Sequence, residues 1–243
     1  MRRFVCATSE RRDGPMGAAD GPVPNSVMRN RTGFLRRLGI PHARLVRVRQ
    51  VHGNSIFAVG KKISKRIPKA DGMITHASNA FLGILTADCV PIFFWDRDYS
   101  VVGIAHAGWR GVVKGIATKM VLQFRSSGIS PRSLRVVIGP AIQKCHFEIW
   151  PDTRHKGLRP FIRSHRSLLK KKKLLIEKNG RIFLDLPGVL YEELIRAGIP
   201  GSHIRSTGEC TFHLSRHFFS YRRKTLGGRD QFGNMLSVIG IRN

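Results

Sequence analysis

Acidic residues are scarce in this sequence. Its 243 residues contain 15 Asp and Glu against 43 Lys and Arg, which gives a formal net charge of +28 at pH 7. Internal ion pairs cannot neutralise such an excess, so the surface must be broadly cationic. Residues 21–70 contain no acidic residue at all. This charge is typical of a protein with a polyanionic partner, and equally of an enzyme with a basic surface, so composition alone does not separate the two.

Cysteine is also rare, and long apolar runs are missing. The four cysteines are spread widely, which excludes a disulfide-rich miniprotein and indicates reduced thiols that remain open to metal binding or catalysis. The longest apolar stretch, Ala80 to Trp95, is interrupted by Thr86 and Asp88. It is shorter than the about 20 residues that a membrane-spanning helix needs. No apolar stretch typical of a secretory signal precedes Glu10. We therefore expect a cytoplasmic protein without a membrane partner.

Hydrophobic periodicity predicts a single α+β domain. An apolar content of 42% supplies a core, and neither a repeat nor a sharp change in composition divides the chain. Apolar runs predict strands at residues 45–51, 81–85, 91–95, 101–105 and 134–138. Apolar residues at helical spacing predict helices at 27–38, 111–127 and 186–197. We expect a loop over residues 1–26 and an exposed excursion over 154–178, where the periodic signal is weak.

Three potential metal ligands each stand at the end of an apolar run. They are His52, Cys89 and His106. Two imidazoles and one thiolate suit Zn²⁺ with a fourth position left to water, as in catalytic zinc sites. A cysteine or histidine taken alone is more often a packed core residue. However, Gly53 and Gly108 permit a close approach of the backbone beside the two histidines, which favours a tight irregular pocket.

Seven motifs occur in an order that matches a known family. They are Gln50-Val51-His52-Gly53, Ala70-Asp71-Gly72-Met73-Ile74-Thr75, Leu85-Thr86-Ala87-Asp88-Cys89-Val90-Pro91-Ile92, Ala105-His106-Ala107-Gly108-Trp109-Arg110-Gly111, Ile138-Gly139-Pro140-Ala141-Ile142 with Cys145 and Glu148, Asp185-Leu186, and Cys210-Thr211-Phe212 with Phe218-Phe219-Ser220-Tyr221-Arg222-Arg223. Together they resemble the YfiH-type family, also called laccase-domain or polyphenol-oxidase-like purine nucleoside phosphorylases. No short motif is specific alone, but seven in this order, over about residues 27 to 240, make chance agreement implausible.

The resemblance implies a fold, a metal and an activity. The fold would be an α/β/β/α sandwich in one catalytic domain over residues 1–243, with residues 1–26 matching poorly. A mononuclear zinc would be held by His52, Cys89 and His106. The activity would be phosphorolysis of adenosine, inosine, guanosine and methylthioadenosine, together with deamination of adenosine, so purine nucleosides and phosphate would be the partners. Bacterial members are also linked to the removal of wrongly incorporated amino acids from peptidoglycan precursors.

The chemistry assigns further residues to this site. Zinc would activate water and polarise a carbonyl group, and Cys89 would belong to the catalytic centre. Phosphorolysis also needs an anion site, for which we assign Arg110 at the start of the helix that follows His106, with Gln50 as a second substrate contact. We assign Asp88 a catalytic role, in which it orients a histidine or accepts a proton. The alternative is a carboxylate that caps backbone amides in a turn.

Other functions remain as alternatives. A multicopper oxidase needs paired His-x-His motifs, and the ten histidines form none, so copper is less expected than zinc. Half of the cytidine-deaminase signature, the Pro-Cys-x-x-Cys part, is missing. Without a metal, Cys89 beside a histidine would be the nucleophile of a cysteine hydrolase, the enzymatic runner-up. Nucleic-acid binding would rest on charge alone, because no recognised motif accompanies it, and would be weak and salt-sensitive. The sequence leaves the oligomeric state open.

Five further residues in the matched motifs are interpreted as packing residues rather than functional ones. The two thiols are open to either use, and the three aromatic side chains would stack on a purine or fill the core, with core as the favoured interpretation. These residues are Cys145, Cys210, Trp109, Phe218 and Phe219.

Overall fold

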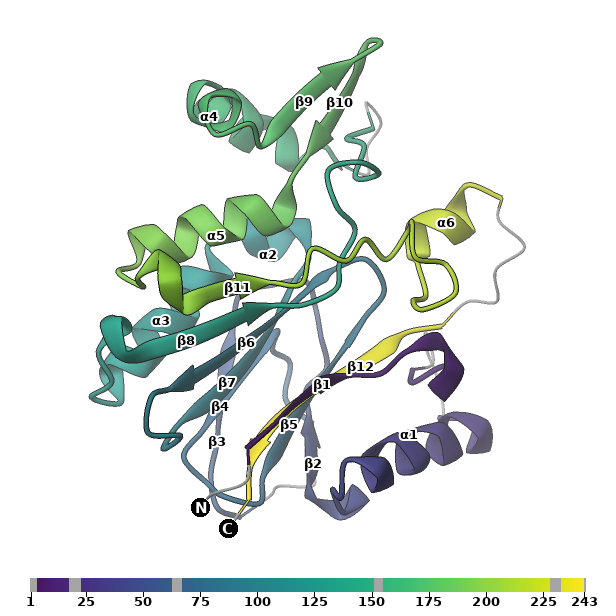
Figure 1. Ribbon diagram of the computed structural model, residues 1–243, viewed down its shortest axis with the longest axis vertical. Helices are drawn as coiled ribbons and strands as arrows, with labels where there is room; N and C mark the ends of the chain where they lie inside the picture. The colour runs from purple at the N-terminus through teal and green to yellow at the C-terminus, as the bar shows by residue number, and fades with distance from the viewer. Residues whose placement is uncertain (1–3, 18–22, 63–66, 151–154, 228–232, 243) are drawn as a thin grey trace.

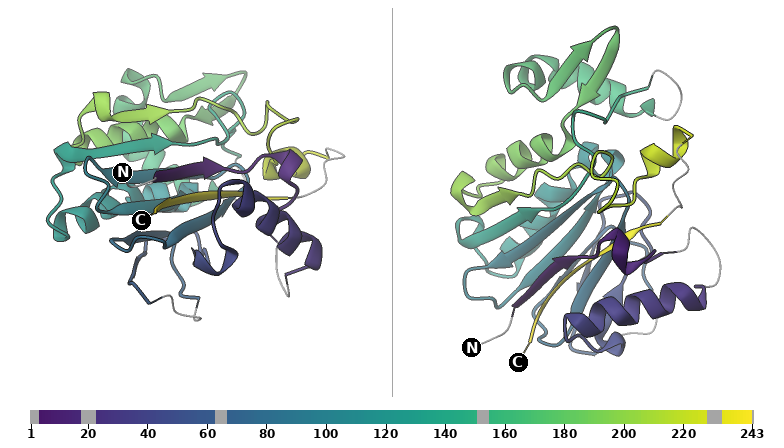
Figure 2. Two further views of the ribbon diagram at one scale, coloured as in Figure 1. Left: turned by 60° about the horizontal axis from the view of Figure 1, so that its bottom comes forward. Right: turned by 45° about the vertical axis from the view of Figure 1, so that its right-hand side comes forward.

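Two β-sheets lie face to face, and helices cover the outer face of each (Figures 1 and 2). The structure is a computed structural model, which describes residues 4–17, 23–62, 67–150, 155–227 and 233–242. The first sheet has the strand order β1-β12-β5-β2. Its strands are β1 (Phe4–Thr8), β2 (Leu45–Arg47), β5 (Phe81–Thr86) and β12 (Met235–Ile241).

The second sheet is larger and has the order β11-β8-β6-β7-β4-β3. Its strands are β3 (Ile56–Val59), β4 (Gly72–Thr75), β6 (Val90–Asp96), β7 (Val102–Ala107), β8 (Leu134–Ile138) and β11 (Ile204–Ser206). Both sheets are mixed, because β2 pairs in parallel with β5, β3 with β4, and β11 with β8, whereas the other pairs are antiparallel. A separate hairpin joins β9 (Leu175–Lys178) to β10 (Arg181–Leu184).

The helices complete the layers. One helix, α1 (Asn25–Arg37), packs on the four-stranded sheet, and α2 (Trp109–Val113), α3 (Ile116–Ser126) and α5 (Leu186–Arg196) cover the six-stranded sheet (Figure 1). At the outer end, α4 (Leu158–Lys171) packs with the β9–β10 hairpin. The short helix α6 (Tyr221–Thr225) precedes β12 in the chain. Short 3₁₀ turns lie at Arg11–Asp13, His42–Arg44, Pro131–Ser133 and Gly201–His203.

Alternation along the strands produces the layers. In β5, Leu82 and Ile84 point toward the other sheet, whereas Phe81 belongs to the cluster that α1 covers. In β6, Phe93 lies in the core between the sheets, and Phe94 packs under the helices on the opposite face. All five side chains are almost completely buried. The predicted α/β/β/α sandwich in a single domain is therefore confirmed.

Three local predictions need correction. Where a loop was expected over residues 1–26, Phe4–Thr8 forms β1, because it pairs with β12 far along the chain, which a local pattern cannot reveal. The helix expected over 111–127 is divided into α2 and α3 at Gly115, whose φ of +71° is left-handed. In the expected excursion, residues 158–171 form α4, which buries Leu158, Ile162 and Leu169. The many cations between these residues hide the helical period in the sequence.

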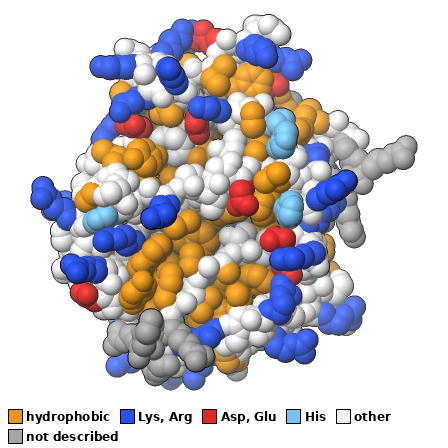
Figure 3. Space-filling view, in the orientation of Figure 1, with side chains coloured by type: hydrophobic (Ala, Val, Ile, Leu, Met, Phe, Trp, Pro, Cys, Tyr) orange, Lys and Arg blue, Asp and Glu red, His pale blue; other side chains and the backbone are white. Residues whose placement is uncertain are grey.

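The surface is cationic, as the composition requires. Figure 3 shows Lys and Arg side chains around most of the visible face, with a band of apolar side chains between them. Half-buried Phe4, Trp95 and Val137, which pack on the core between the sheets, contribute apolar surface of this kind. None of the helices in the described ranges has both the length and the apolar character needed to span a bilayer.

Candidate functional site

The predicted ligands converge at one edge of the sandwich. His106 lies near the end of β7, which pairs antiparallel with β6 so that His106 is opposite Pro91. Cys89 comes directly before β6, and this pairing brings its thiol beside the His106 ring. His52 arrives on the loop after β2, and its ring centre lies 4.8 Å from that of His106. One ligand atom of each of the three side chains lies within 4.8 Å of the other two.

A buried aspartate fixes both histidines. Asp71 Oδ1 accepts hydrogen bonds from Nδ1 of His106 and from the backbone N–H of His52, both at 2.9 Å, while Oδ2 accepts from Gly53 N at 2.6 Å. Burial alone would raise the pKa of Asp71, but these bonds and the charge of His106 hold it below its usual value. Because an ionised carboxylate only accepts, Nδ1 of His106 carries a proton, so Nε2 is the nitrogen that would bind a metal once its own proton is displaced.

The sequence motif that contains Asp71 does not by itself reveal the role of this residue. Its partners lie 18 to 35 residues away, so its contacts are not visible from spacing alone. The signal that could have identified it is a carboxylate directly before a strand, in a chain with so few acids.

Glycine leaves room for the ligand atoms. A Cβ at Gly108 would lie 2.8 Å from His52 Nδ1 and 3.1 Å from Cys89 Sγ, closer than side-chain atoms ordinarily approach. A Cβ at Gly111 would lie 2.8 Å from the carbonyl oxygen of Gly53. The close approach expected beside the two histidines is therefore present, and any larger residue at position 108 would push the sulfur and the imidazole apart.

The cysteine and the buried histidine form a coupled pair. Burial would raise the pKa of Cys89, but the charges and hydrogen bonds of His106 and His52 outweigh it and lower this pKa to about 6. Burial would likewise lower the pKa of His106, but Cys89 and Asp71 raise it to about 9. The site thus stabilises a thiolate, which is the form of cysteine that binds metals and attacks electrophiles.

Both carboxylate oxygens of Asp88, the residue beside Cys89, accept hydrogen bonds. Its Oδ1 accepts from Thr211 Oγ1 at 2.6 Å, and its Oδ2 accepts from Ser220 Oγ at 3.0 Å and from Arg222 N at 2.6 Å. The residue has a φ of +83°, a strained value for a non-glycine residue that these contacts hold in place. These are the contacts of a carboxylate that binds backbone and hydroxyl donors, and the catalytic role of Asp88 stays a prediction.

The two predicted substrate contacts differ in their surroundings. The Gln50 amide pairs with Leu85 through both of its ends, since Nε2 donates to the carbonyl oxygen at 2.7 Å and Oε1 accepts from the N–H at 2.8 Å. This pairing ties the loop that carries His52 to the end of β5. Arg110 is exposed, and its guanidinium lies 4.5 Å from the ring centre of Trp109. It is two residues from Gly108, where an added Cβ would meet the ligand atoms of His52 and Cys89.

Of the residues interpreted as packing residues, some are buried as expected and Cys145 is not. Phe218 and Phe219 are buried in a small cluster with Met235, as expected. Cys210 is also buried, at 7% exposure, but Cys145 is exposed, so its interpretation as a packed thiol is wrong. Cys145 lies on a turn outside the sheets, where the short motif gives no information on depth.

Comparison with known proteins places the chain in a family. The sequence model of the family described as multi-copper polyphenol oxidoreductase laccase matches residues 9–242. The chain belongs to this family. A relative from Geobacillus stearothermophilus named purine nucleoside phosphorylase YlmD is 35% identical over 236 residues, which cover 93% of this chain and 83% of the relative.

Solved structures agree with this assignment. The crystal structure of YlmD from Geobacillus stearothermophilus matches with a TM-score of 0.86 at 32% identity, over 99% of this chain and 92% of that one. The hypothetical protein YfiH from Bacillus licheniformis matches with a TM-score of 0.81 at 33% identity, over 93% and 85% of the two chains. The resemblance inferred from the motifs is therefore confirmed.

The laccase family's description suggests copper, and the residues themselves accept more than one metal. One sulfur and two nitrogens suit Zn²⁺ and copper alike. The fit is supported by Asp71, which holds the ring of His106, and by Gly108, which clears space beside His52 and Cys89. Such a set of side chains is capable of holding a metal ion.

Proposed function

We propose that the protein is a zinc-dependent purine nucleoside phosphorylase whose metal is held by His52, Cys89 and His106. The observation that carries this proposal is the convergence of the three donor atoms within 4.8 Å. It occurs in a chain whose relatives are named purine nucleoside phosphorylases. Zinc is favoured over copper because the donor set is that of a catalytic zinc site and the chain has no His-x-His pairs.

The residues of the chain prepare this site. When bound, zinc would supply a Lewis acid that stabilises negative charge on a reacting oxygen. Asp71 keeps His106 in one tautomer, and the lowered pKa of Cys89 keeps the sulfur anionic at neutral pH. Because His52 is exposed, a substrate approaches from its side. Reduced thiols are required, which accords with the cytoplasmic location expected from the sequence.

Phosphorolysis also requires a cation for phosphate. In this reaction an oxygen of phosphate bonds to C1′ of the ribose, the C1′–N9 bond breaks, and the base leaves with the electron pair and takes up a proton. Arg110 is our choice for the phosphate contact, because it is exposed and lies next to the segment that touches the ligands. Its helix, α2, has only five residues, so the guanidinium rather than the helix terminus would bind the anion. Gln50 stays a proposed second contact.

The same site would take related nucleosides. Methylthioadenosine presents the same glycosidic bond, and adenosine deamination needs water to attack C6 of the purine while ammonia leaves. We include both as proposed activities of the His52, Cys89 and His106 site, and a substrate panel of inosine, guanosine, adenosine and methylthioadenosine tests them.

The test of the main proposal is release of free base from inosine with phosphate. Hypoxanthine and ribose 1-phosphate are measured by chromatography for wild type, for Cys89→Ala and for the matched control Cys6→Ala, whose thiol lies on β1 outside the site. Loss of an actual ligand should cost more than the about 10- to 100-fold typical of losing its supporting partner. The proposal fails if wild type and Cys89→Ala release base at equal rates.

A second candidate is a cysteine hydrolase. It is favoured by one observation, the sequence of contacts from Cys89 to His106 and on to Asp71, which is the arrangement of a thiolate nucleophile with an oriented histidine. Such an enzyme would cleave an amide, as in the editing of amino acids in peptidoglycan precursors. Hydrolysis that persists after removal of zinc by a chelator, but stops on alkylation of Cys89, would favour this candidate. Activity that returns only with added zinc would exclude it.

A further inference from the structure

A second group of soft donor atoms lies outside the site described above. It consists of Cys145, His146 and Cys210, which each offer one donor atom within 4.8 Å of the other two. The two sulfurs are 3.7 Å apart, and His146 Nδ1 lies 3.0 Å from Cys145 Sγ and 3.6 Å from Cys210 Sγ. Both cysteines are free thiols. Cys145 and Cys210 belong to two of the matched motifs, but the proposed phosphorolysis assigns neither of them, nor His146, a role.

The separations are those of ligands around one metal ion. A tetrahedral zinc with Zn–S bonds of about 2.3 Å and Zn–N bonds of about 2.0 Å separates two sulfurs by about 3.8 Å and a sulfur from a nitrogen by about 3.5 Å. The observed sulfur–sulfur distance and the longer sulfur–nitrogen distance are close to these values. The shorter contact needs only a small rotation of His146 or of exposed Cys145.

The backbone holds this group in place. Cys210 forms a parallel bridge with Ala141, four residues before Cys145. The ring of His146 stacks on Phe212, with ring centres 4.2 Å apart and planes inclined by 24°. The guanidinium of Arg222 donates to the carbonyl oxygen of His146 at 3.2 Å. Two chain segments that are distant in sequence are thereby fixed beside each other before any ion binds.

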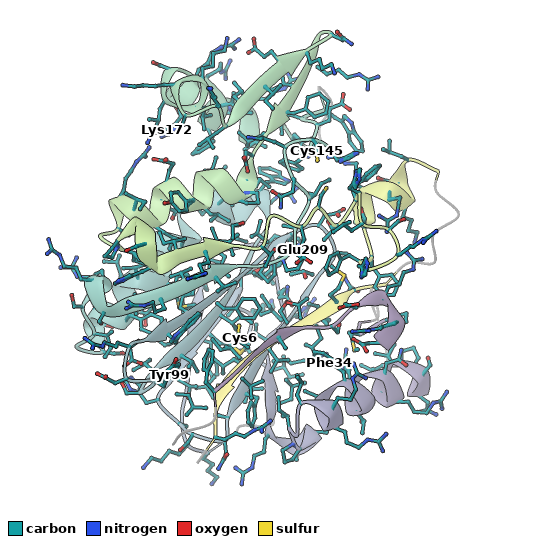
Figure 4. All side chains as sticks on the ribbon, in the orientation of Figure 1. Cys6, Phe34, Tyr99, Cys145, Lys172 and Glu209 are labelled. Carbon is teal, nitrogen blue, oxygen red and sulfur yellow. The ribbon has the colours of Figure 1, made fainter. Side chains whose placement is uncertain are left out.

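Two acidic residues act electrostatically on this group. Asp185 acts electrostatically on Cys145, and Asp88 acts on His146. Glu209 directly precedes Cys210, and Figure 4 shows Cys145 beneath the β9–β10 hairpin with Glu209 below it, toward the sheets. Asp185 also pairs with Lys144 at 3.5 Å, so the preference for a divalent cation rests on the two thiols and the imidazole, which are ligand types of zinc.

We propose that Cys145, His146 and Cys210 form a second metal site that binds Zn²⁺. Cys210 is buried, His146 is half-buried and Cys145 is exposed, so a fourth position faces solvent. Asp88 connects this site to the first, because it neighbours Cys89 and accepts hydrogen bonds from Thr211 and Arg222. An ion at the second site would brace the segments that hold Asp88. The proposal stands whether or not the first site catalyses phosphorolysis.

The first experiment counts zinc. Metal-free reduced protein is titrated with Zn²⁺ against a chromophoric chelator, in wild type, Cys89→Ser, the double variant Cys145→Ser with Cys210→Ser, and the control Cys6→Ser. We expect two equivalents for wild type and for the control, and one for each of the other two. If the double variant binds as many equivalents as wild type, or if Cys89→Ser binds none, the proposal is overturned. Circular dichroism verifies that each variant is folded before it is counted.

The second experiment identifies the thiols. In the Cys89→Ser background, alkylation of Cys145 and Cys210 by iodoacetamide is followed by peptide mass spectrometry with and without Zn²⁺, and Cys6 serves as the internal reference. Zinc should slow alkylation of both thiols by at least about 10-fold while Cys6 is unaffected, since a coordinated thiolate is not free to react. Equal rates with and without zinc, or a Cys145–Cys210 disulfide that persists under reductant, would contradict the assignment. Zinc protection in this background, together with no nucleoside phosphorolysis by the wild-type protein, would refute only the proposed activity.

Discussion

The two cysteine–histidine groups offer the same kinds of donor atoms in different settings. In the first, His106 is buried on β7 and its ring is held by the carboxylate of Asp71. In the second, Cys145 and His146 lie on a turn, and His146 is supported by ring stacking on Phe212. A charged hydrogen bond fixes the direction of a ring more strictly than stacking does. We therefore expect the first group to bind zinc more tightly than the second.

The pKa values of Cys89 and Cys145 also favour tighter zinc binding at the first group. In the first group, the histidines lower the pKa of Cys89 to about 6 despite its burial. In the second, desolvation and the charge of Cys210 raise the pKa of Cys145 to about 11. Neighbouring imidazoles stabilise a thiolate, whereas a neighbouring thiol destabilises it. The comparison shows that the groups beside a cysteine, and not its burial alone, decide whether it forms the thiolate that binds a metal.

Removal of a ligand from the first group should have the largest effect. His106→Ala deletes a buried metal ligand and leaves Asp71 without its imidazole partner. We expect zinc to bind only at the second group, and base release to fall by more than about 100-fold, beyond the loss of a supporting partner. Zinc stoichiometry and initial rates measure this, with the exposed His217→Ala as control. Two retained equivalents would show that His106 is not a ligand.

Removal of the supporting carboxylate should have the next largest effect. In Asp71→Asn, an amide replaces an acceptor that receives N–H groups from His52, Gly53 and His106. We expect zinc affinity at the first group to fall by about 10- to 100-fold, with the second group unchanged. Competition titration measures both affinities, and exposed Asp98→Asn is the matched control. An equal loss of zinc affinity at both groups would show that Asp71 does not support the first group specifically.

A methyl group beside the first ligands should have a smaller effect. In Gly108→Ala the new Cβ would lie 2.8 Å from His52 Nδ1 and 3.1 Å from Cys89 Sγ. Overpacking of about 1 to 3 kcal/mol predicts a zinc affinity at least about 5-fold lower at this group. Gly60→Ala is the control, because nothing lies within 4 Å of its added Cβ. If both variants bind zinc equally, the ligands do not need this clearance.

A change remote from both groups should have the smallest effect. Gly33 lies within α1 and an added Cβ would meet nothing within 4 Å. Gly33→Ala should raise the free energy of unfolding by about 0.5 to 1 kcal/mol, because alanine favours the helix. Denaturant unfolding measures it, and zinc binding at both groups should not change. A change in zinc binding would mean that global stability, rather than local geometry, controls the two groups.

The main strands of the sandwich and the group of His52, Cys89 and His106 could be predicted from the sequence, because each shows a recognisable pattern within a short stretch of the chain. Each buried run, in β5, β6 and β7, is an unbroken stretch of sequence. The same holds for each motif around His52, Cys89 and His106. The helix α4 was missed, since its three buried residues are diluted by cations. The role of Asp71 and the meeting of Cys145 with Cys210 depend on contacts between segments up to 65 residues apart. Such contacts have no periodic signature.

The position of β12 governs when this protein can complete its fold. This strand lies between β1 and β5, although a ribosome makes Met235–Ile241 long after Phe81–Thr86. Until those residues emerge, the nascent chain carries a bare edge on β5, the strand that leads to Cys89. Closure of this sheet must wait for late translation, because its pairings are among the most distant in the chain. A growing polypeptide with this topology therefore keeps one strand edge unpaired until its last strand is made.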